Sequence, residues 1–225
     1  MNKSWLSVFH PYTFLKNNLF KRKKVIMSKY NWLLDNGHGG MINGKYQTKG
    51  KRSPVYDGRQ IFEGVYNREI VDIVHRYLKS NAIDSSILVP EQEDISLRER
   101  VRRVNETYKH KPNTILVSFH LNLGGGTGFE VYTSKGETFS DKFATMFAQY
   151  WQQNTDFVVR TDYSDGGPDK EANFYILKYT YCPAILVESL FMDNKNDFDY
   201  LISKEGKHKI AENHINSILN CEKYL

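Results

Sequence analysis

Short apolar runs alternate with segments of helical periodicity along most of this chain. Runs that predict strands lie at residues 32–34, 85–89, 114–119, 129–133, 157–159 and 184–187. Apolar residues at three- and four-residue steps predict helices over residues 61–78, 96–107, 139–151, 194–202 and 205–220. Strands that alternate with helices indicate an α/β sandwich built on a mostly parallel sheet.

Polar and glycine-rich stretches separate these elements and add further signals. Ser96, followed three residues later by Glu99, has the spacing of a capping box, which predicts that a helix begins there. Residues 41–60 are polar, with glycine, proline and lysine throughout, and we expect a long loop. A loop of this length inside a compact domain is usually functional.

Three of the predicted strands lead into side chains that can bind a metal or carry a proton. The first strand is followed by a glycine-rich turn that contains His38. The strand at 114–119 ends at His120, and the strand at 184–187 ends at Glu188. In open α/β sheets, ligands bind beyond the carboxyl ends of the strands. We therefore expect a site at this edge of the sheet.

A catalytic zinc ion usually takes three His, Asp or Glu ligands and leaves one position for water. His38, His120 and Glu63, which starts a helix, form a candidate set. Each also has a plainer interpretation: a solvated loop histidine, a strand-end histidine satisfied by backbone, and a first-turn carboxylate that favours the helix dipole. Glu188 follows an apolar run, where an unpaired carboxylate would be costly unless a cation or a proton relieved it. The other five histidines are interpreted as surface or structural residues: His10, His75, His110, His208 and His214.

The formal charge of +5 changes the picture only at the amino terminus. Residues 1–26 hold six of the 31 basic side chains and no acidic one, which leaves 25 basic against 26 acidic residues in the remainder. A body of near-zero net charge gives no support for a nucleic-acid groove. We divide the 225 residues into a basic head, 1–26, and one globular domain, 27–225, since this length suits a single core.

The head resembles neither a membrane span nor a secretory signal. No stretch approaches ~18 consecutive apolar residues, and the apolar pieces of the head are broken by His10, Pro11 and Lys16. Met27 is typical of a chain start just ahead of the first strand, so our hypothesis is that the head is disordered or dispensable. We expect synthesis in the cytoplasm without a signal peptide, and no stable membrane insertion. The two cysteines, Cys182 and Cys221, are too few for a disulfide framework.

Five segments in order along residues 31–220 carry a combined signature. They are Trp32-Leu33-Leu34-Asp35-Asn36-Gly37-His38-Gly39-Gly40; Glu63 with Asn67; Ser96-Leu97-Arg98-Glu99-Arg100-Val101; Ser118-Phe119-His120-Leu121-Asn122 with Gly128-Phe129-Glu130-Val131-Tyr132; and Pro183-Ala184-Ile185-Leu186-Val187-Glu188-Ser189-Leu190-Phe191 with Asn194. Together they resemble the zinc-dependent N-acetylmuramoyl-L-alanine amidases of family 3.

This resemblance implies one zinc ion held by His38, Glu63 and His120, with Glu188 as the catalytic acid/base. It implies hydrolysis of the amide bond between N-acetylmuramic acid and L-alanine in peptidoglycan. The implied fold is a three-layer α/β sandwich with a mixed, mostly parallel sheet of about six strands flanked by helices. We assign substrate binding to Asn67, Arg52, Asn122 and Asn173.

The sequence departs from the family pattern at a few positions beside the expected site. Leu121 and Leu123 replace small residues next to His120, and Leu190 stands where the family generally has glycine. These changes bear on the fit of the substrate more than on the metal ligands.

Two other functions remain open. A zinc peptidase or amidase that acts on soluble peptides or muropeptides would share the metal site and need a cation for the substrate carboxylate, such as Arg52, Arg59 or Arg160. A non-catalytic wall-binding module would be expected to lack Glu188 or a metal ligand, whereas all four residues are present. Without a signal peptide, the enzyme would reach the wall after release, as a phage endolysin does, or act on recycled fragments in the cytosol. We favour the endolysin and expect a monomer.

Overall fold

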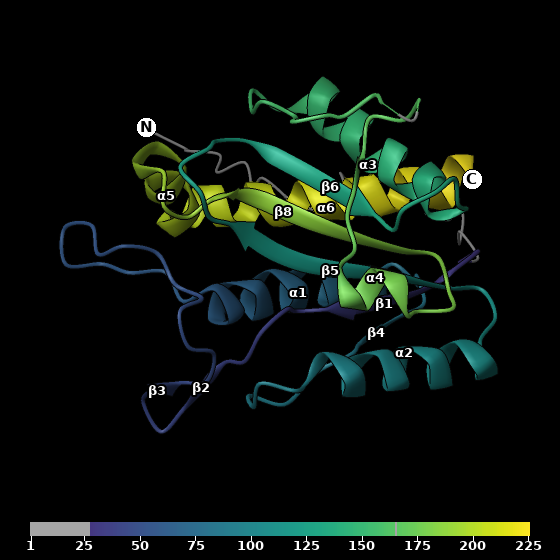
Figure 1. Cartoon of the computed structure of the whole chain (residues 1–225), viewed down its shortest axis with the longest axis horizontal. Coiled ribbons are helices and arrows are strands. Elements are labelled where there is room, and N and C mark those ends of the chain that lie inside the picture. Colours follow the sequence, from purple (N-terminus) through teal and green to yellow (C-terminus); the bar gives the residue numbers. More distant parts are fainter. Residues whose placement is uncertain (1–27, 165) are drawn as a thin grey trace, which may run out of the picture.

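The computed structural model describes residues 28–164 and 166–225, so the predicted basic head lies outside the described residues. Six strands form one sheet in the order β4-β1-β5-β8-β6-β7 (Figure 1). Their bounds are Asn31–Asp35 for β1, Ser85–Ile87 for β4, Thr114–Asn122 for β5, Phe129–Thr133 for β6, Lys170–Glu171 for β7 and Ala184–Phe191 for β8. Among the described strands of this sheet, only β6 and β8 pair in the antiparallel sense, which confirms the mixed, mostly parallel sheet.

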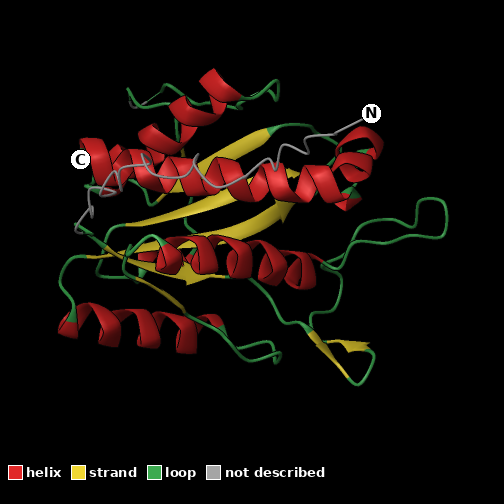
Figure 2. Cartoon of the chain, turned by 180° about the vertical axis from the view of Figure 1, so that it is seen from behind, coloured by secondary structure: helices red, strands yellow, loops and turns green. Residues whose placement is uncertain are grey.

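Helices cover both faces of this sheet, giving the three layers expected (Figure 2). One face packs against α1 (Glu63–Ser80), α3 (Ser140–Asn154), α5 (Lys195–Ile202) and α6 (Lys204–Tyr224), and the other against α2 (Leu97–His110) and the short α4 (Tyr175–Lys178). Side chains alternate along a strand, so Trp32 and Leu34 enter the larger core while Leu33 enters the smaller one. The two cores explain why the central strands are apolar on both faces.

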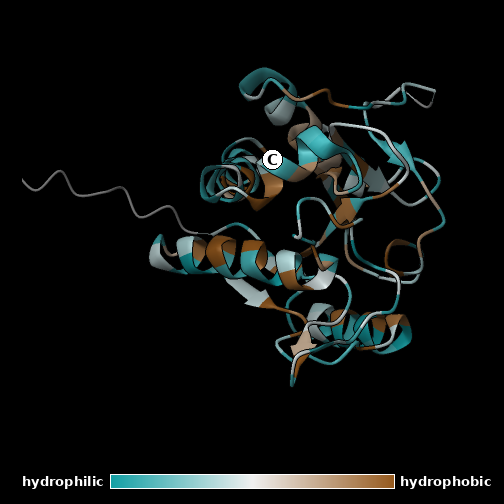
Figure 3. Ribbon diagram, turned by 90° about the vertical axis from the view of Figure 1, so that its left-hand side faces the viewer, coloured by the Kyte–Doolittle hydropathy of each residue, from teal (hydrophilic) through white to brown (hydrophobic). Residues whose placement is uncertain are grey.

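Local signals start the helices where the pattern predicts. The Ser96 hydroxyl accepts the amide of Glu99 at 3.3 Å, and the Ser203 hydroxyl accepts the amide of Gly206 at 2.9 Å. Hydrophobic and hydrophilic residues alternate along the helices (Figure 3), which lets each bury one stripe against the sheet. Within the described residues, no helix is long and apolar enough to cross a membrane.

Several elements differ from the prediction. Residues 157–159 form no strand, because only Val159 bridges to Phe129 before the chain turns away. The strand expected to end at His120 continues to Asn122 through a register shift, and β8 runs three residues past Glu188 to Phe191. Strand β7 and helix α4 were not predicted, since two and four residues are too few to show a period.

The predicted loop at residues 41–60 contains local structure of its own. Strands β2 (Met41–Ile42) and β3 (Lys45–Tyr46) form a small hairpin, which the prediction missed. The whole segment projects from the end of the molecule at which the carboxyl ends of β1, β5 and β8 lie (Figure 1). It is therefore placed to border anything bound at that edge of the sheet.

Candidate active site

A left-handed turn directly after β1 positions His38. Gly37 has a φ of +44° and His38 a φ of +53°. A Cβ atom on Gly37 would lie 2.6 Å from Cε1 of His120, so this position needs glycine for space as well as for its backbone angle. Histidine in this conformation costs free energy, and such strain is typical of functional sites. The turn brings the rings of His38 and His120 to a centroid distance of 4.9 Å.

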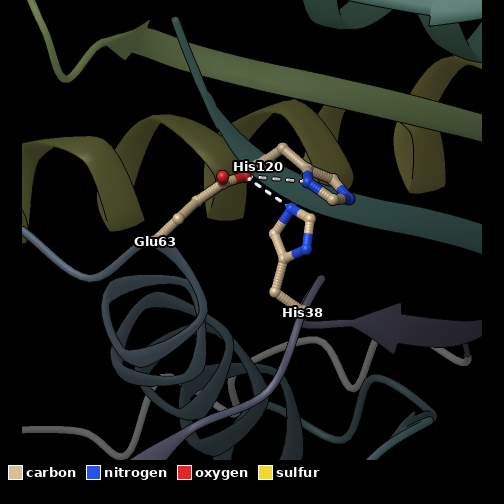
Figure 4. A group of neighbouring side chains, drawn as sticks. All are labelled: His38, Glu63 and His120. Atoms are coloured by element: carbon tan, nitrogen blue, oxygen red, sulfur yellow. Dashed lines mark hydrogen bonds and ion pairs between the residues drawn. The ribbon is translucent and has the colours of Figure 1, made fainter. Parts of the chain in front are cut away.

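The carboxylate of Glu63 faces one nitrogen of each of these two imidazoles (Figure 4). Glu63 is the first residue of α1, and its Oε1 lies 3.1 Å from Nε2 of His38 and 2.9 Å from Nδ1 of His120. One ligand atom from each of the three residues falls within 4.8 Å of the others. The structure thus brings together the three side chains predicted to hold a metal, although 25 and 57 residues separate them in the sequence.

The donor set fits a zinc ion. Oε2 of Glu63 is buried and has no hydrogen-bond partner in the part of the chain that the structure describes, and the buried Nε2 of His38 has only the carboxylate of Glu63 beside it. Such atoms are costly to leave unsatisfied, and a bound cation would satisfy them. Two imidazole nitrogens and one carboxylate form a donor set that is found in catalytic zinc enzymes and leaves one position open.

A hydrogen-bonded chain behind His120 selects its tautomer. The Ser118 hydroxyl donates to Oδ2 of Asp35 at 2.6 Å, and it lies 3.2 Å from Nε2 of His120. Its single proton is given to Asp35, so the hydroxyl accepts from Nε2 and the proton of the neutral ring sits there. With a metal in place of the hydrogen bond between Nδ1 and Glu63, Nδ1 of His120 would present its lone pair to the ion, the arrangement that supports a ligand.

Arg100 fixes the far end of this chain. Its guanidinium donates to Oδ1 of Asp35, to the carbonyl of His38 at 2.8 Å and to the carbonyl of Ile95 at 2.9 Å. Both Arg100 and Asp35 are only 2 % exposed. Neither Asp35 nor Ser118 was singled out as functional from the sequence, although Ser118 stands two residues before His120 and so shares its face of β5.

The electrostatics of the three ligands are coupled. Burial alone would raise the pKa of Glu63, but hydrogen bonds and charge from His120 and His38 hold it well below its ordinary value. Burial lowers the pKa of His38. For His120, burial is outweighed by the hydrogen bond and charge of Glu63, and its pKa is raised. Glu63 therefore stays ionised, as a metal ligand must.

Glu188 lies in register with His120 on the neighbouring strand. The two residues are paired across β5 and β8, so their side chains share one face of the sheet. Burial raises the pKa of Glu188 to about 8; the opposing charge of His120 offsets part of this rise, and the like charge of Glu63 adds to it. Its Oε2 is buried and has no hydrogen-bond partner among the described residues. A carboxyl group of this kind can accept and return a proton near neutral pH.

A cavity of about 460 Å³ joins these groups, a size typical of ligand sites. His38, His120 and Glu188 lie on its wall at the sheet edge, and α2 and α4 close the opposite side. Its apolar lining is formed by Ile95, Leu97, Phe174, Tyr175, Ile176 and Leu186. The cavity is also lined by Lys51, which belongs to the loop predicted to be functional but is not one of the four residues predicted to bind substrate.

None of the four residues predicted to bind substrate is among the described residues that line this cavity. Asn67 is one helical turn from Glu63 and 2 % exposed. The amide of Asn122 donates to Oε2 of Glu130 at 2.5 Å, and Arg52 lies over the ring of Phe62. Asn173 is exposed, next to the lining residue Phe174. The assignment of these four to substrate binding stays a prediction.

Glu130 forms a buried polar cluster beside Glu188, with which it pairs across β6 and β8. Its Oε1 accepts Nε of Arg160 at 2.7 Å and Nζ of Lys170 at 2.6 Å. Burial raises the pKa of Glu130, but the hydrogen bonds from Lys170 and Arg160 outweigh this and lower it. Arg160, considered above as a cation for a peptidase substrate, is therefore engaged by Glu130.

The chain is similar to several proteins whose names describe amidases or an endolysin. The chain is 38 % identical over 102 residues to the N-acetylmuramoyl-L-alanine amidase CwlM of Bacillus licheniformis, a match that spans 45 % of this chain and 38 % of that protein. It is 27 % identical over 210 residues to the endolysin of Bacillus phage SPP1, spanning 88 % of this chain and 68 % of the endolysin. Among solved structures, the amidase AmiC2 of Nostoc punctiforme superposes with a TM-score of 0.67 at 24 % identity, covering 88 % of this chain and 99 % of that one.

The family comparison covers most of the chain. The family model described as N-acetylmuramoyl-L-alanine amidase matches residues 33–220, a range that contains all three candidate metal ligands and Glu188. The likeness to AmiC2 agrees with the six-stranded sheet and its helical layers. The chain belongs to the N-acetylmuramoyl-L-alanine amidase family.

Proposed function

We propose that the protein is a zinc-dependent amidase that cuts the bond between N-acetylmuramic acid and L-alanine in peptidoglycan. The observation that carries this proposal is the arrangement of Glu188: a buried carboxyl group in register with His120, lining the same cavity as His38 and His120. A metal site alone could be structural, whereas a metal site with an adjacent proton carrier is typical of hydrolysis. The choice of the bond that is cut is based on membership of the N-acetylmuramoyl-L-alanine amidase family.

The chain's own residues divide the chemistry between them. Zinc held by His38, Glu63 and His120 would polarise the amide carbonyl and bring the pKa of a bound water toward about 7. Glu188 takes the proton of the attacking water and returns it to the leaving amine. Asp35, through Ser118, keeps His120 in the tautomer that faces the site. Helices α2 and α4 restrict access of bulk water to one side of the cavity.

Digestion of purified peptidoglycan tests this function directly. We expect stem peptides that begin with L-alanine, identified by mass analysis, and their loss with a chelator and recovery with zinc. Cleavage within the stem would overturn the proposed bond, and activity that survives the chelator would overturn the role of zinc. Intact wall together with cleavage of soluble fragments would favour the muropeptide amidase instead.

Two variants separate the roles of metal and proton carrier. Glu188→Gln is expected to keep the zinc content and lose about 100-fold or more of turnover, the range of general acid–base catalysis. His120→Ala is expected to lose zinc, with His110→Ala as the matched control because His110 is exposed on α2. Unchanged zinc in His120→Ala would remove that residue from the ligand set.

We also infer that the protein acts on the wall after release from the cell that makes it. The similarity to a phage endolysin supports this inference. Lysis of sensitive cells by protein supplied at the outer face of their wall is the expected result. Activity confined to soluble fragments would contradict it.

A further inference from the structure

A short backbone ladder fixes Lys51 beside the metal ligand Glu63. The amide of Glu63 donates to the carbonyl of Lys51 at 3.0 Å, and the amide of Ser53 donates to the carbonyl of Ile61 at 2.9 Å. Between them, Arg52 and Phe62 form an antiparallel bridge. A backbone hydrogen bond to the candidate metal ligand Glu63 thus fixes the position of Lys51.

The alternation of this ladder assigns Lys51 and Arg52 to opposite sides. Residues directly opposite each other in an antiparallel pair share a face, and neighbours along a strand point to different faces. Arg52 therefore shares a face with Phe62, and its guanidinium lies 5.8 Å from that ring. Lys51 therefore lies on the same face as Glu63. Its side chain points toward the cavity, which Lys51 helps to line.

The ammonium of Lys51 is the cation of this cavity that remains available. No hydrogen bond or ion pair of its side chain is found within the described residues, although it lines the same cavity as His38 and Glu188. Arg100, the other cation of the wall, is occupied by Asp35 and by two backbone carbonyls. The side chain of Lys51 is exposed at the mouth, where an incoming charged group can reach it.

We propose that Lys51 binds a carboxylate of the substrate, that of the stem residue which follows L-alanine. This inference rests on the proposed function, which places the scissile amide beside Glu188. One residue of extended chain spans about 3.3–3.6 Å, so the carboxylate one residue from that amide lies within reach of a lysine at the cavity wall. The second residue of the stem is a D-glutamate joined through its side chain, so its α-carboxylate is either free or amidated. Lys51 would make the enzyme favour the free acid.

A pair of matched substrates tests this preference. N-acetylmuramoyl-L-alanyl tripeptides with D-isoglutamate or with D-isoglutamine at the second position differ only in that carboxylate. We expect wild-type protein to favour the acid, and Lys51→Ala to lose about 10- to 100-fold in kcat/KM on the acid while changing little on the amide. Lys51→Arg is expected to restore part of the preference. Lys49→Ala removes the same charge from the same exposed loop and should change neither substrate.

Other outcomes would overturn the assignment. Equal losses on both substrates would mean that Lys51 acts on the reacting carbonyl or on the loop structure. Loss of the preference in Arg52→Ala instead of Lys51→Ala would transfer the role to its neighbour. An unchanged preference in Lys51→Ala would remove a carboxylate contact altogether.

A binding measurement makes the test independent of turnover. Calorimetric titration of zinc-loaded Glu188→Gln with the same two tripeptides compares their affinities without cleavage. Tighter binding of the acid, lost when Lys51→Ala is added, supports the proposal even if the bond that is cut proves to be a different one. Equal affinities for acid and amide in both proteins would refute it while leaving the amidase function intact.

Discussion

Two regions that border the cavity, the sheet edge and the loop that carries Lys51, are built in opposite ways. The sheet wall, which comprises the carboxyl ends of β1, β5 and β8, presents half-buried side chains that fully buried groups hold in place. Asp35, Ser118 and Arg100 are each at most 2 % exposed. The loop wall, residues 41–62, is held by backbone hydrogen bonds and by local side-chain hydrogen bonds, and it presents exposed side chains such as Lys51.

This difference separates what the two walls can do. Buried, hydrogen-bonded groups keep ligands in one geometry, which a metal and a proton carrier require. A loop with exposed side chains can change its sequence at little cost to folding, and so it can adapt to a substrate. The comparison predicts that substitutions in the sheet wall lower stability strongly, while those in the loop wall act mainly on local order and substrate preference.

The largest effect is expected at Arg100. Arg100→Ala leaves the carboxylate of Asp35 buried without its cation, so the free energy of unfolding should fall by about 3–5 kcal/mol. Arg102→Ala is the matched control on the same helix, because the Arg102 pair with Glu99 is solvent-exposed and should matter little. Urea unfolding of both variants measures the difference. Equal effects would show that the sheet wall does not depend on this ion pair.

The next largest loss of stability is expected at Leu190, where alanine should destabilise more than glycine. The residue is fully buried and has a φ of +72°, in the left-handed region that favours glycine. Leu190→Ala loses the buried side chain, at about 2–5 kcal/mol, and keeps the backbone strain. Leu190→Gly loses the same side chain but relieves a strain of roughly 1–2 kcal/mol. We therefore expect Leu190→Gly to be less destabilising than Leu190→Ala. A higher midpoint temperature of thermal unfolding for Leu190→Ala would contradict this.

The sequence was informative about the sheet wall for a physical reason. A strand buried on both faces must be apolar, so the polar residues that follow, His38, His120 and Glu188, stand out against it. Asp35 also follows an apolar run, but its supporting role could not be predicted, because it depends on Arg100 and Ser118, which are distant in the chain. The register shift after His120 likewise depends on contacts between strands, and this is why β5 extends beyond its predicted end.

The loop wall was harder to predict because its order comes from pairing rather than from an apolar pattern. Residues 51–53 pair with 61–63, and a turn at Asp57-Gly58, with φ values of +51° and +72°, reverses the chain between them. An Asp-Gly dipeptide is a known hairpin signal and could have located this turn. Without the ladder, Lys51 and Arg52 are indistinguishable in sequence, and so the prediction named Arg52.

His214 of α6 packs against the face of the sheet opposite the cavity, and its burial should make stability depend on pH. It is fully buried, and its Nε2 lies 2.8 Å from the hydroxyl of Ser189, the residue after Glu188. Burial lowers its pKa from 6.5 to about 3. The unfolded chain thus binds one more proton than the folded chain between these values, and stability is lost as the pH falls from 6.5 toward 3, by about 1.4 kcal/mol per pH unit.

A variant that cannot titrate isolates this contribution. His214→Gln removes the ionisable ring, so its unfolding free energy should fall less steeply than that of the wild type between pH 6.5 and 5.5. The shared contributions of other acidic and basic groups cancel in the difference between the two proteins. Parallel pH profiles would mean that His214 is protonated in the folded state as readily as in the unfolded one.

The smallest global effect is expected in the loop wall, at Tyr56. Its hydroxyl donates to the carbonyl of Asp193 at 2.6 Å, and its ring packs against Phe198 at a centroid distance of 4.8 Å. Tyr56→Phe keeps the ring and removes one hydrogen bond, worth about 0.5–1.5 kcal/mol. If the two walls differ as proposed, the loss falls on local opening of residues 51–63 and leaves global unfolding nearly unchanged. Limited proteolysis should then cut this loop faster while the urea midpoint stays within error, whereas a midpoint shift as large as that of Arg100→Ala would show that the loop wall is part of the cooperative core.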